Sequence, residues 1–169
     1  MNDAPRIHQR DGQAYVALQH RVTMAGFSAE IDAGFPALFD WLGRNGVAPA
    51  GAPFIRYLLI DMAGFLEIQL CVPIAQGDTA RVEANERIRT DVVPAGRYAT
   101  LLHVGHYDGL VAANGALQEW AAEQQLAWDV AHSVDGERWG ARIETYTTNP
   151  AEEPDQSKWE VEISYRLAD

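Results

Sequence analysis

The chain has 169 residues, 47% of them hydrophobic, and a formal net charge of −11 from 13 basic and 24 acidic side chains. This length and composition suit the core of one ordinary domain. The acidic balance argues against a surface that neutralises phosphates, so we expect no direct nucleic-acid binding and no membrane partner.

Cysteine content and the N-terminal residues bear on the compartment. Cys71 is the single cysteine, which excludes an internal disulfide, and it lies in the apolar run LEIQLCVPI, where a buried, inert thiol is the usual outcome. The N-terminal residues are polar and lack the apolar segment of a signal peptide, and no stretch approaches the roughly 20 apolar residues of a membrane span. These features predict a cytoplasmic protein.

The first half of the chain reads as strand, helix, strand and strand. Alternating side chains predict a strand over residues 13–24, followed by a turn at Ala25-Gly26. Residues 53–61 and 65–74 read as a hairpin around Met62-Ala63-Gly64. Between them, apolar residues recur three and four positions apart, as on one face of an amphipathic helix: Phe35, Leu38, Phe39 and Leu42.

The limits of this helix follow from residues with restricted or unusual backbone geometry. Pro36 suits an early helical turn, where its missing N–H group has no intrahelical partner to lose. Asn45 and Gly46 are typical of a helix end.

The second half shows the same order. Residues 81–93 and 97–105 supply strand material, and residues 138–148 and 158–167 read as a closing pair of strands around a turn-rich segment. A second helix is predicted by its apolar stripe: Leu110, Ala113, Leu117, Trp120 and Ala121.

Short matches link the two halves. ALFDWL at 37–42 aligns with ALQEWA at 116–121, and LEIQL at 66–70 aligns with WEVEI at 159–163. Chance could produce each match, but their shared order favours a duplicated β-α-β-β unit. We predict an α+β fold with repeats over about 13–74 and 81–168, two helices on one face of a mainly antiparallel sheet, and a groove between the halves. The joining segment 75–80 is short, so the halves should form one body.

The motifs in this order resemble the GyrI-like small-molecule-binding family, which also supplies effector-binding domains of AraC-type and MerR-type regulators. The most specific parts are PAGRYATLLHVGHYDGL at 94–110 and a Glu-x-Tyr followed by Asn-Pro: Glu144, Tyr146, Asn149 and Pro150. The resemblance implies a groove for hydrophobic, often cationic ligands, with a carboxylate contacting the positive centre. Glu144 matches that carboxylate. Because the matched motifs nearly fill the chain, we expect a stand-alone member without a DNA-binding domain.

Glu144 and Tyr146 lie two residues apart and therefore project from the same strand face. Glu144 could anchor a cation in an apolar pocket or could be an ordinary solvated charge. Tyr57 becomes the counterpart of Tyr146 when residues 55–57 are laid on 144–146, although core packing is an equal alternative.

The other candidate ligand contacts are less specific: Ile55, Tyr98, Tyr107 and Trp139. The sequence departs from the family pattern at Ile143, where an aromatic residue commonly precedes the glutamate. The nearest upstream aromatic is Trp139, which leaves the shape of the ligand open.

Metal and cofactor sites are not expected. His103 and His106 are three residues apart, but no cysteine or carboxylate set completes a metal site. The sequence has no nucleophile elbow, phosphate loop or dinucleotide fingerprint.

Three functions follow. The first is binding of hydrophobic or amphipathic, cationic small molecules through Glu144. The second, implied by the resemblance to family hydrolases, is opening of strained electrophilic rings in DNA-alkylating natural products, with Glu144 as general base and Tyr146 as acid. The third is a protein partner, as in family members that resemble gyrase inhibitors. The sequence does not separate binding from turnover, because the same residue pair serves both.

Overall fold

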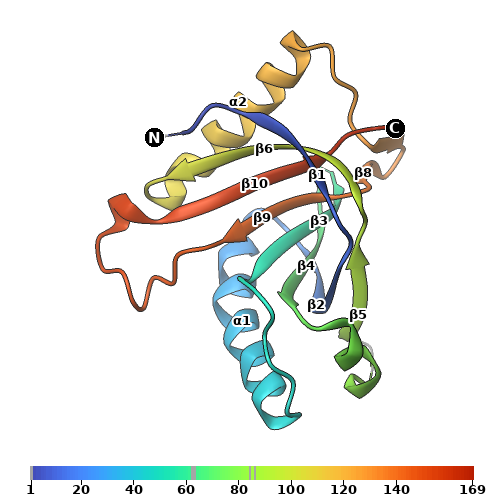
Figure 1. Ribbon diagram of the computed structural model, residues 1–169, viewed down its shortest axis with the longest axis vertical. Helices are drawn as coiled ribbons and strands as arrows, with labels where there is room; N and C mark the ends of the chain where they lie inside the picture. Colours follow the sequence, from blue (N-terminus) through green and yellow to red (C-terminus); the bar gives the residue numbers. More distant parts are fainter. Residues whose placement is uncertain (1, 62–63, 84, 86) are drawn as a thin grey trace.

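A computed structural model describes residues 2–61, 64–83, 85 and 87–169 (Figure 1). In this part of the chain, ten strands and two longer helices build an α+β fold, joined by three short 3-10 turns. The elements are β1 Arg6–Arg10, β2 Gln13–Val22, α1 Phe27–Arg44, β3 Phe54–Ile60, β4 Leu66–Pro73, β5 Ile88–Val93, β6 Gly96–Val104, α2 Leu110–Glu123, β7 Val130–Ser133, β8 Gly136–Trp139, β9 Arg142–Tyr146 and β10 Glu160–Arg166.

The strands form one curled, antiparallel sheet in the order β1-β6-β10-β9-β3-β4-β2-β5, and the β7–β8 hairpin attaches to β3 (Figure 1). The units β2-α1-β3-β4 and β6-α2-β9-β10 have the same topology, and β3 and β9 pair where the two units meet. Ile55 faces Glu144 in that pair, as expected for equivalent positions beside a twofold axis. The predicted fold class is therefore confirmed, while the limits of the repeats stay a prediction.

The edge strands depart from the sequence prediction. β1 was not predicted, because RIHQR lacks an apolar alternation, and it pairs with β6 of the second unit. β5 lies in the segment assigned to the second repeat, yet it pairs with β2 of the first unit. Each unit is thus extended by an edge strand from outside its own β-α-β-β segment: β1 joins the second unit, and β5 joins the first. Residues 84 and 86 of the predicted strand 81–93, and 62 and 63 of the predicted hairpin turn, lie outside the described residues.

Two element boundaries also differ. Helix α1 begins at Phe27, so Pro36 lies in its interior and not in an early turn. An interior proline removes one helical hydrogen bond, which destabilises the helix locally. The segment 138–148 is not one strand, because the strand is interrupted at Gly140, between the end of β8 and the start of β9. A Cβ atom on Gly140 would lie 1.8 Å from Asp129 Oδ2, so only glycine fits this close approach.

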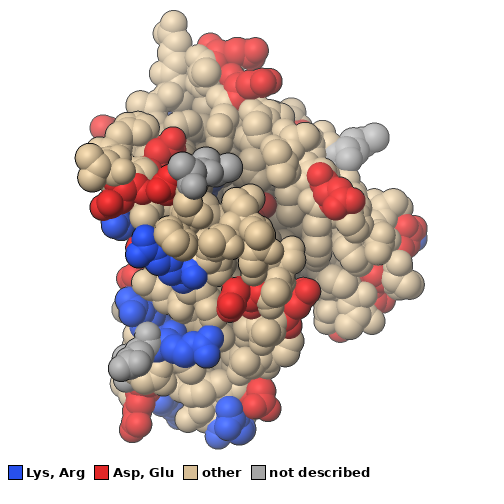
Figure 2. Space-filling view, turned by 180° about the vertical axis from the view of Figure 1, so that it is seen from behind, with Lys and Arg blue, Asp and Glu red and all other residues tan. Residues whose placement is uncertain are grey.

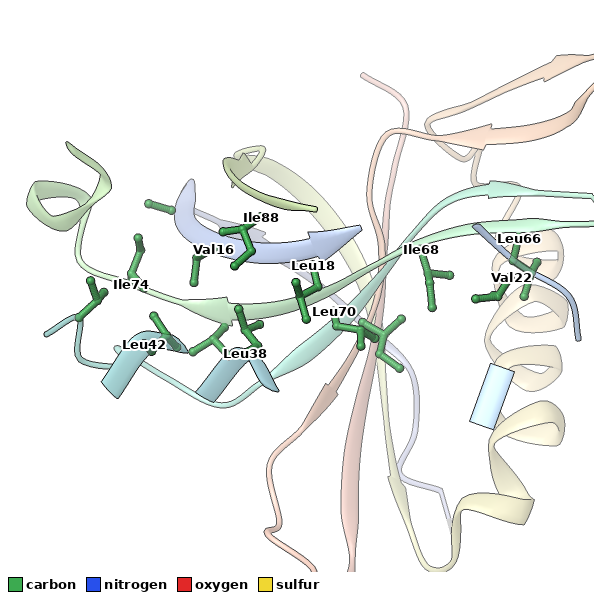
Figure 3. Close-up of a cluster of buried hydrophobic side chains, with 14 residues drawn as sticks. Val16, Leu18, Val22, Leu38, Leu42, Leu66, Ile68, Leu70, Ile74 and Ile88 are labelled. Carbon is green, nitrogen blue, oxygen red and sulfur yellow. The ribbon is translucent and has the colours of Figure 1, made fainter. Parts of the chain in front are cut away.

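Each helix buries its apolar face on the outer strands of its own unit. α1 packs against β2 and β4, where Leu38 and Leu42 point toward Leu70 and the neighbouring strand residues (Figure 3). α2 packs against β6, where Ala113 and Leu117 join a second cluster. A third cluster lies inside the curl of the sheet: Tyr15, Ala17, Phe54, Cys71, Val93, Tyr98, Ala141 and Ile143. The central β3–β9 pair lies between the two helices, and side chains of α1 and α2 reach it from either side.

On the face shown in Figure 2, the acidic side chains do not form one continuous patch. Figure 2 shows basic side chains gathered along one side of the face it presents, and acidic side chains spread over that face. Within the described part of the chain, neither helix has the length and hydropathy needed to cross a membrane.

Candidate functional site

A cavity of ≈ 1190 Å³ occupies the space between the two helices above the β3–β9 pair. Residues from α1, α2, β3 and β9 line it, together with the segment Thr147, Thr148, Asn149 and Pro150 that follows β9. The predicted groove between the halves is therefore present as a geometric feature, and it has the size of a small-molecule pocket.

Glu144 lies at this cavity and is only 5% exposed. One carboxylate oxygen, Oε1, accepts a hydrogen bond from the Tyr57 hydroxyl group, and the other, Oε2, accepts one from Asn114 Nδ2 at 3.4 Å. Burial raises the pKa of the Glu144 carboxyl, and the hydrogen bonds from Tyr57 and Asn114 act in the opposite direction. The site thus holds a carboxylate whose ionised form is disfavoured by burial and is stabilised in part by Tyr57, Asn114 and the positive charge of Arg142.

Asn114 connects the carboxylate to a second hydrogen-bond donor. Its Oδ1 atom accepts a hydrogen bond of 2.5 Å from the Tyr165 hydroxyl, and Gln118 Nε2 donates to that same hydroxyl at 3.3 Å. These hydrogen bonds link β9 through α2 to β10. They fix the amide orientation of Asn114, so the NH₂ group is presented to Glu144.

Aromatic rings form the walls beside the carboxylate. Tyr146 makes edge contacts with Phe35 of α1 and with Tyr107, at centroid distances of 6.4 and 5.5 Å. Tyr57 stacks on Phe27, at 6.1 Å. Burial raises the pKa of the Tyr146 hydroxyl, and the nearby Glu144 raises it further, so Tyr146 remains neutral at physiological pH. Such walls suit an apolar or aromatic ligand surface.

Among the described residues that line the cavity, Arg142 is the basic one. It precedes Glu144 by two positions on β9, so both side chains project from one strand face. The guanidinium group lies over the rings of Tyr165, Trp139 and Tyr57, at 4.6, 4.9 and 5.9 Å from their centroids. These contacts hold a positive charge beside the aromatic floor.

The structure brings together four of the seven residues predicted to contact a ligand. Glu144, Tyr146, Tyr57 and Tyr107 all line the cavity. Asn149 and Pro150, which carried the family resemblance together with the glutamate, also line it.

The other three do not line this cavity among the described residues, which corrects their expected placement. Ile55 is fully buried beside Glu144 in the α1 cluster. Tyr98 points to the inner side of the sheet and donates a hydrogen bond to Pro94 O. Trp139 packs between Trp128 and Tyr165 in the α2 cluster. Their burial is core packing, which sequence alone does not distinguish from pocket lining.

Several lining residues were missed by the sequence prediction. Asn114 and Arg142 are polar, and each carried a signal: Asn114 interrupts the apolar face of α2, and Arg142 shares the strand face of Glu144. The α1 residues Phe27 and Ile31 were missed because the helix was expected to begin near Pro36, whereas Phe35 was assigned to the apolar stripe of that helix and not to the cavity.

A model of the GyrI-like small molecule binding domain matches residues 3–168. The chain is a member of the GyrI-like family. The resemblance predicted from the motifs is therefore confirmed over almost the whole chain. No curated protein matches the sequence of this GyrI-like chain.

Solved structures with low sequence identity share the fold. The C-terminal domain of EcmrR is 18% identical, with a TM-score of 0.74 and 98% of each chain covered. EcmrR in its complex with DNA gives a TM-score of 0.76 at 18% identity, and the GyrI-like chain covers 57% of that longer chain and 98% of its own length.

Two further relatives are more distant. SAV2435 bound to tetraphenylphosphonium is 9% identical, with a TM-score of 0.63 and coverage of 98% of this chain and 94% of that one. A hydrolase from Listeria innocua is 8% identical, with a TM-score of 0.58 and coverage of 97% and 91%.

Proposed function

We propose that this GyrI-like protein binds hydrophobic or amphipathic cations in the cavity between α1 and α2, with Glu144 as the counter-charge. The observation that carries the proposal is the position of Glu144, which is 5% exposed and lies at an aromatic-walled cavity of ≈ 1190 Å³.

The physical argument rests on what each part of the site contributes. Aromatic and apolar walls gain affinity by removing ligand surface from water, whatever the detailed shape of the ligand. A buried carboxylate then offsets the hydration that a cation loses on entry. The relative SAV2435 was solved with tetraphenylphosphonium, which is a cation of this class. This likeness supports the ligand chemistry proposed for the present chain.

Titration of the protein with tetraphenylphosphonium by calorimetry tests the proposal. Glu144→Gln keeps the shape and one acceptor oxygen for Asn114, while its NH₂ group can donate to the Tyr57 hydroxyl; it removes the charge, so we expect affinity to fall at least about tenfold. Glu119→Gln is the matched control, because it makes the same charge change on the exposed face of α2, outside the cavity lining of the described residues. Equal affinity of the native protein and both variants for tetraphenylphosphonium would contradict the proposal.

Hydrolysis of strained electrophilic rings is the second candidate. The raised pKa of Glu144 suits a general base, and the hydroxyl of Tyr146 lies in the same cavity. Glu144 would take a proton from water while the water oxygen attacks a ring carbon. The bond from that carbon to the ring heteroatom would break, and Tyr146 would donate a proton to the heteroatom. One distant relative carries the name hydrolase.

Turnover distinguishes this candidate from binding. Styrene oxide or a simple aziridine is incubated with a substoichiometric amount of protein, and the ring-opened product is counted against the protein present. Several product molecules per protein, lost in Glu144→Gln and in Tyr146→Phe, would establish catalysis. Product at the rate of the uncatalysed reaction would leave binding alone.

A further inference from the structure

The guanidinium group of Arg142 has hydrogen-bond donors without a protein acceptor. No described residue places a carboxylate oxygen within 4.0 Å of it or accepts a hydrogen bond from it, although three aromatic rings surround it. A guanidinium group carries five N–H donors, and burying them without acceptors is costly.

Arg56 and Arg166, two other arginines with little exposed side-chain surface, behave differently. Arg56 donates to the Tyr15 hydroxyl and to Gly140 O, at 2.8 and 2.7 Å. Arg166 donates to Asp129 and to Ala95 O, at 2.9 and 3.1 Å. Their donors are therefore used within the fold, whereas Arg142 keeps its donors at the cavity that it lines.

The charge of Arg142 lowers the pKa of Glu144, but among the described residues no hydrogen bond and no ion pair within 4.0 Å joins the two side chains. The two residues share a strand face two positions apart, which separates their side-chain origins by about 7 Å. The carboxylate instead receives its hydrogen bonds from Tyr57 and Asn114. The cavity therefore presents two opposite charges side by side, each available to a different part of one ligand.

We infer that Arg142 is a second ligand contact, which selects amphipathic cations that also carry a carboxylate or carbonyl oxygen. The inference rests on the proposed function, since Glu144 binds the positive end of the same molecule. Arg142 binds the oxygen with its N–H groups while the rings of Trp139 and Tyr165 hold the guanidinium plane. The preferred ligands are thus zwitterions or acceptor-bearing cations with an apolar body.

Two probes that differ in one group test the inference. Pentyltriphenylphosphonium and (4-carboxybutyl)triphenylphosphonium have the same cation and chain length, and the second carries a carboxylate in place of the terminal methyl group. At neutral pH we expect the native protein to bind the carboxylated probe about tenfold more tightly. Arg142→Met retains an unbranched apolar side chain, and it should abolish this preference while it keeps or improves affinity for the pentyl probe.

Controls separate the inference from the proposed function. Arg138→Met removes the same charge from β8, where Arg138 pairs with Glu67 at 3.7 Å, and it should keep the preference. Arg142→Gln is the second variant, and thermal unfolding shows that each variant is folded. Absence of a preference in the native protein, or a preference that survives both Arg142 variants, would overturn the inference, as would an equal gain for both probes in Arg142→Met. If the native protein bound neither probe, the proposed function itself would be wrong.

Discussion

The hydroxyl group of Tyr57 in β3 donates a hydrogen bond to the carboxylate of Glu144 in β9, so the two halves of the fold meet at this contact. Tyr57 lies two residues beyond Ile55, which faces Glu144 in the β3–β9 pair. The tyrosine therefore reaches the carboxylate diagonally, along the same sheet face. The contact depends on both strands, and a single half would not form it.

Removal of this hydroxyl should shift the pH dependence of binding. The hydrogen bond from Tyr57 lowers the pKa of Glu144, against the raising effect of burial. In Tyr57→Phe we expect the pKa of Glu144 to rise further, so the midpoint of tetraphenylphosphonium affinity against pH should move to higher pH. Tyr98→Phe is the matched control, because its hydroxyl donates to Pro94 O on the inner side of the sheet. A midpoint that stays in place in Tyr57→Phe would contradict the prediction.

Affinity for a permanent cation should itself depend on pH. Burial raises the pKa of Glu144, and only the ionised carboxylate offsets the ligand charge. Below that pKa we expect affinity for tetraphenylphosphonium to fall about tenfold per pH unit, with a plateau above it. Calorimetry in buffers of different ionisation enthalpy should detect proton release on binding. Glu144→Gln should give a flat profile over the same range, and a native profile equally flat would exclude Glu144 as the counter-charge.

The sequence predicted the parts of the fold that repeat and the parts of the site that share a strand face. The duplicated strand and helix order was visible because LEIQL and WEVEI keep the same alternation, and Glu144 with Tyr146 followed from the period of two. Edge strand β1 was not visible, because its residues RIHQR show no apolar pattern and its place depends on pairing with distant β6. Long-range pairing of this kind leaves little local trace.

The same limit applies to individual aromatic residues. Tyr57, Tyr98 and Trp139 are all aromatic strand residues, and only their position in the folded sheet decides whether they face the cavity or the core. Tyr57 was placed by its equivalence to Tyr146, whereas Tyr98 had no such equivalence and Trp139 was named as the nearest aromatic residue upstream of Glu144. The equivalence of strand positions in the two halves therefore indicated the cavity-lining residues better than residue type did.

Charge burial at Glu144 should lower the stability of the unliganded protein. The folded-state pKa is raised, so the native state binds more protons than the unfolded state between the ordinary and the raised pKa. Stability from this group is therefore present at acid pH and is lost as pH rises through that interval. We expect Glu144→Gln to unfold at a temperature that rises relative to the native protein as pH increases. Scanning calorimetry at several pH values measures this difference, and a difference that narrows with pH would be the opposite result.

Added side-chain volume in α1 should destabilise the protein at Gly34 but not at Gly43. A Cβ atom on Gly34 would lie 2.2 Å from Leu70 Cδ1, and Leu70 is fully buried in β4. Gly34→Ala gains up to about 1 kcal/mol of helix propensity but forces α1 away from the sheet, which costs about 1–3 kcal/mol. We expect a net loss of about 1 kcal/mol in the free energy of unfolding.

Gly43 in the last turns of α1 is the matched control for this change. A Cβ atom there meets nothing within 4 Å, so Gly43→Ala should stabilise the protein by about 0.5–1 kcal/mol through backbone entropy alone. Urea unfolding of the two variants measures both effects. Because Phe35 follows Gly34 and lines the cavity, displacement of α1 in Gly34→Ala should also weaken tetraphenylphosphonium binding, whereas Gly43→Ala should leave it unchanged. Equal stability changes in the two variants would show that α1 does not approach β4 as closely as this packing requires.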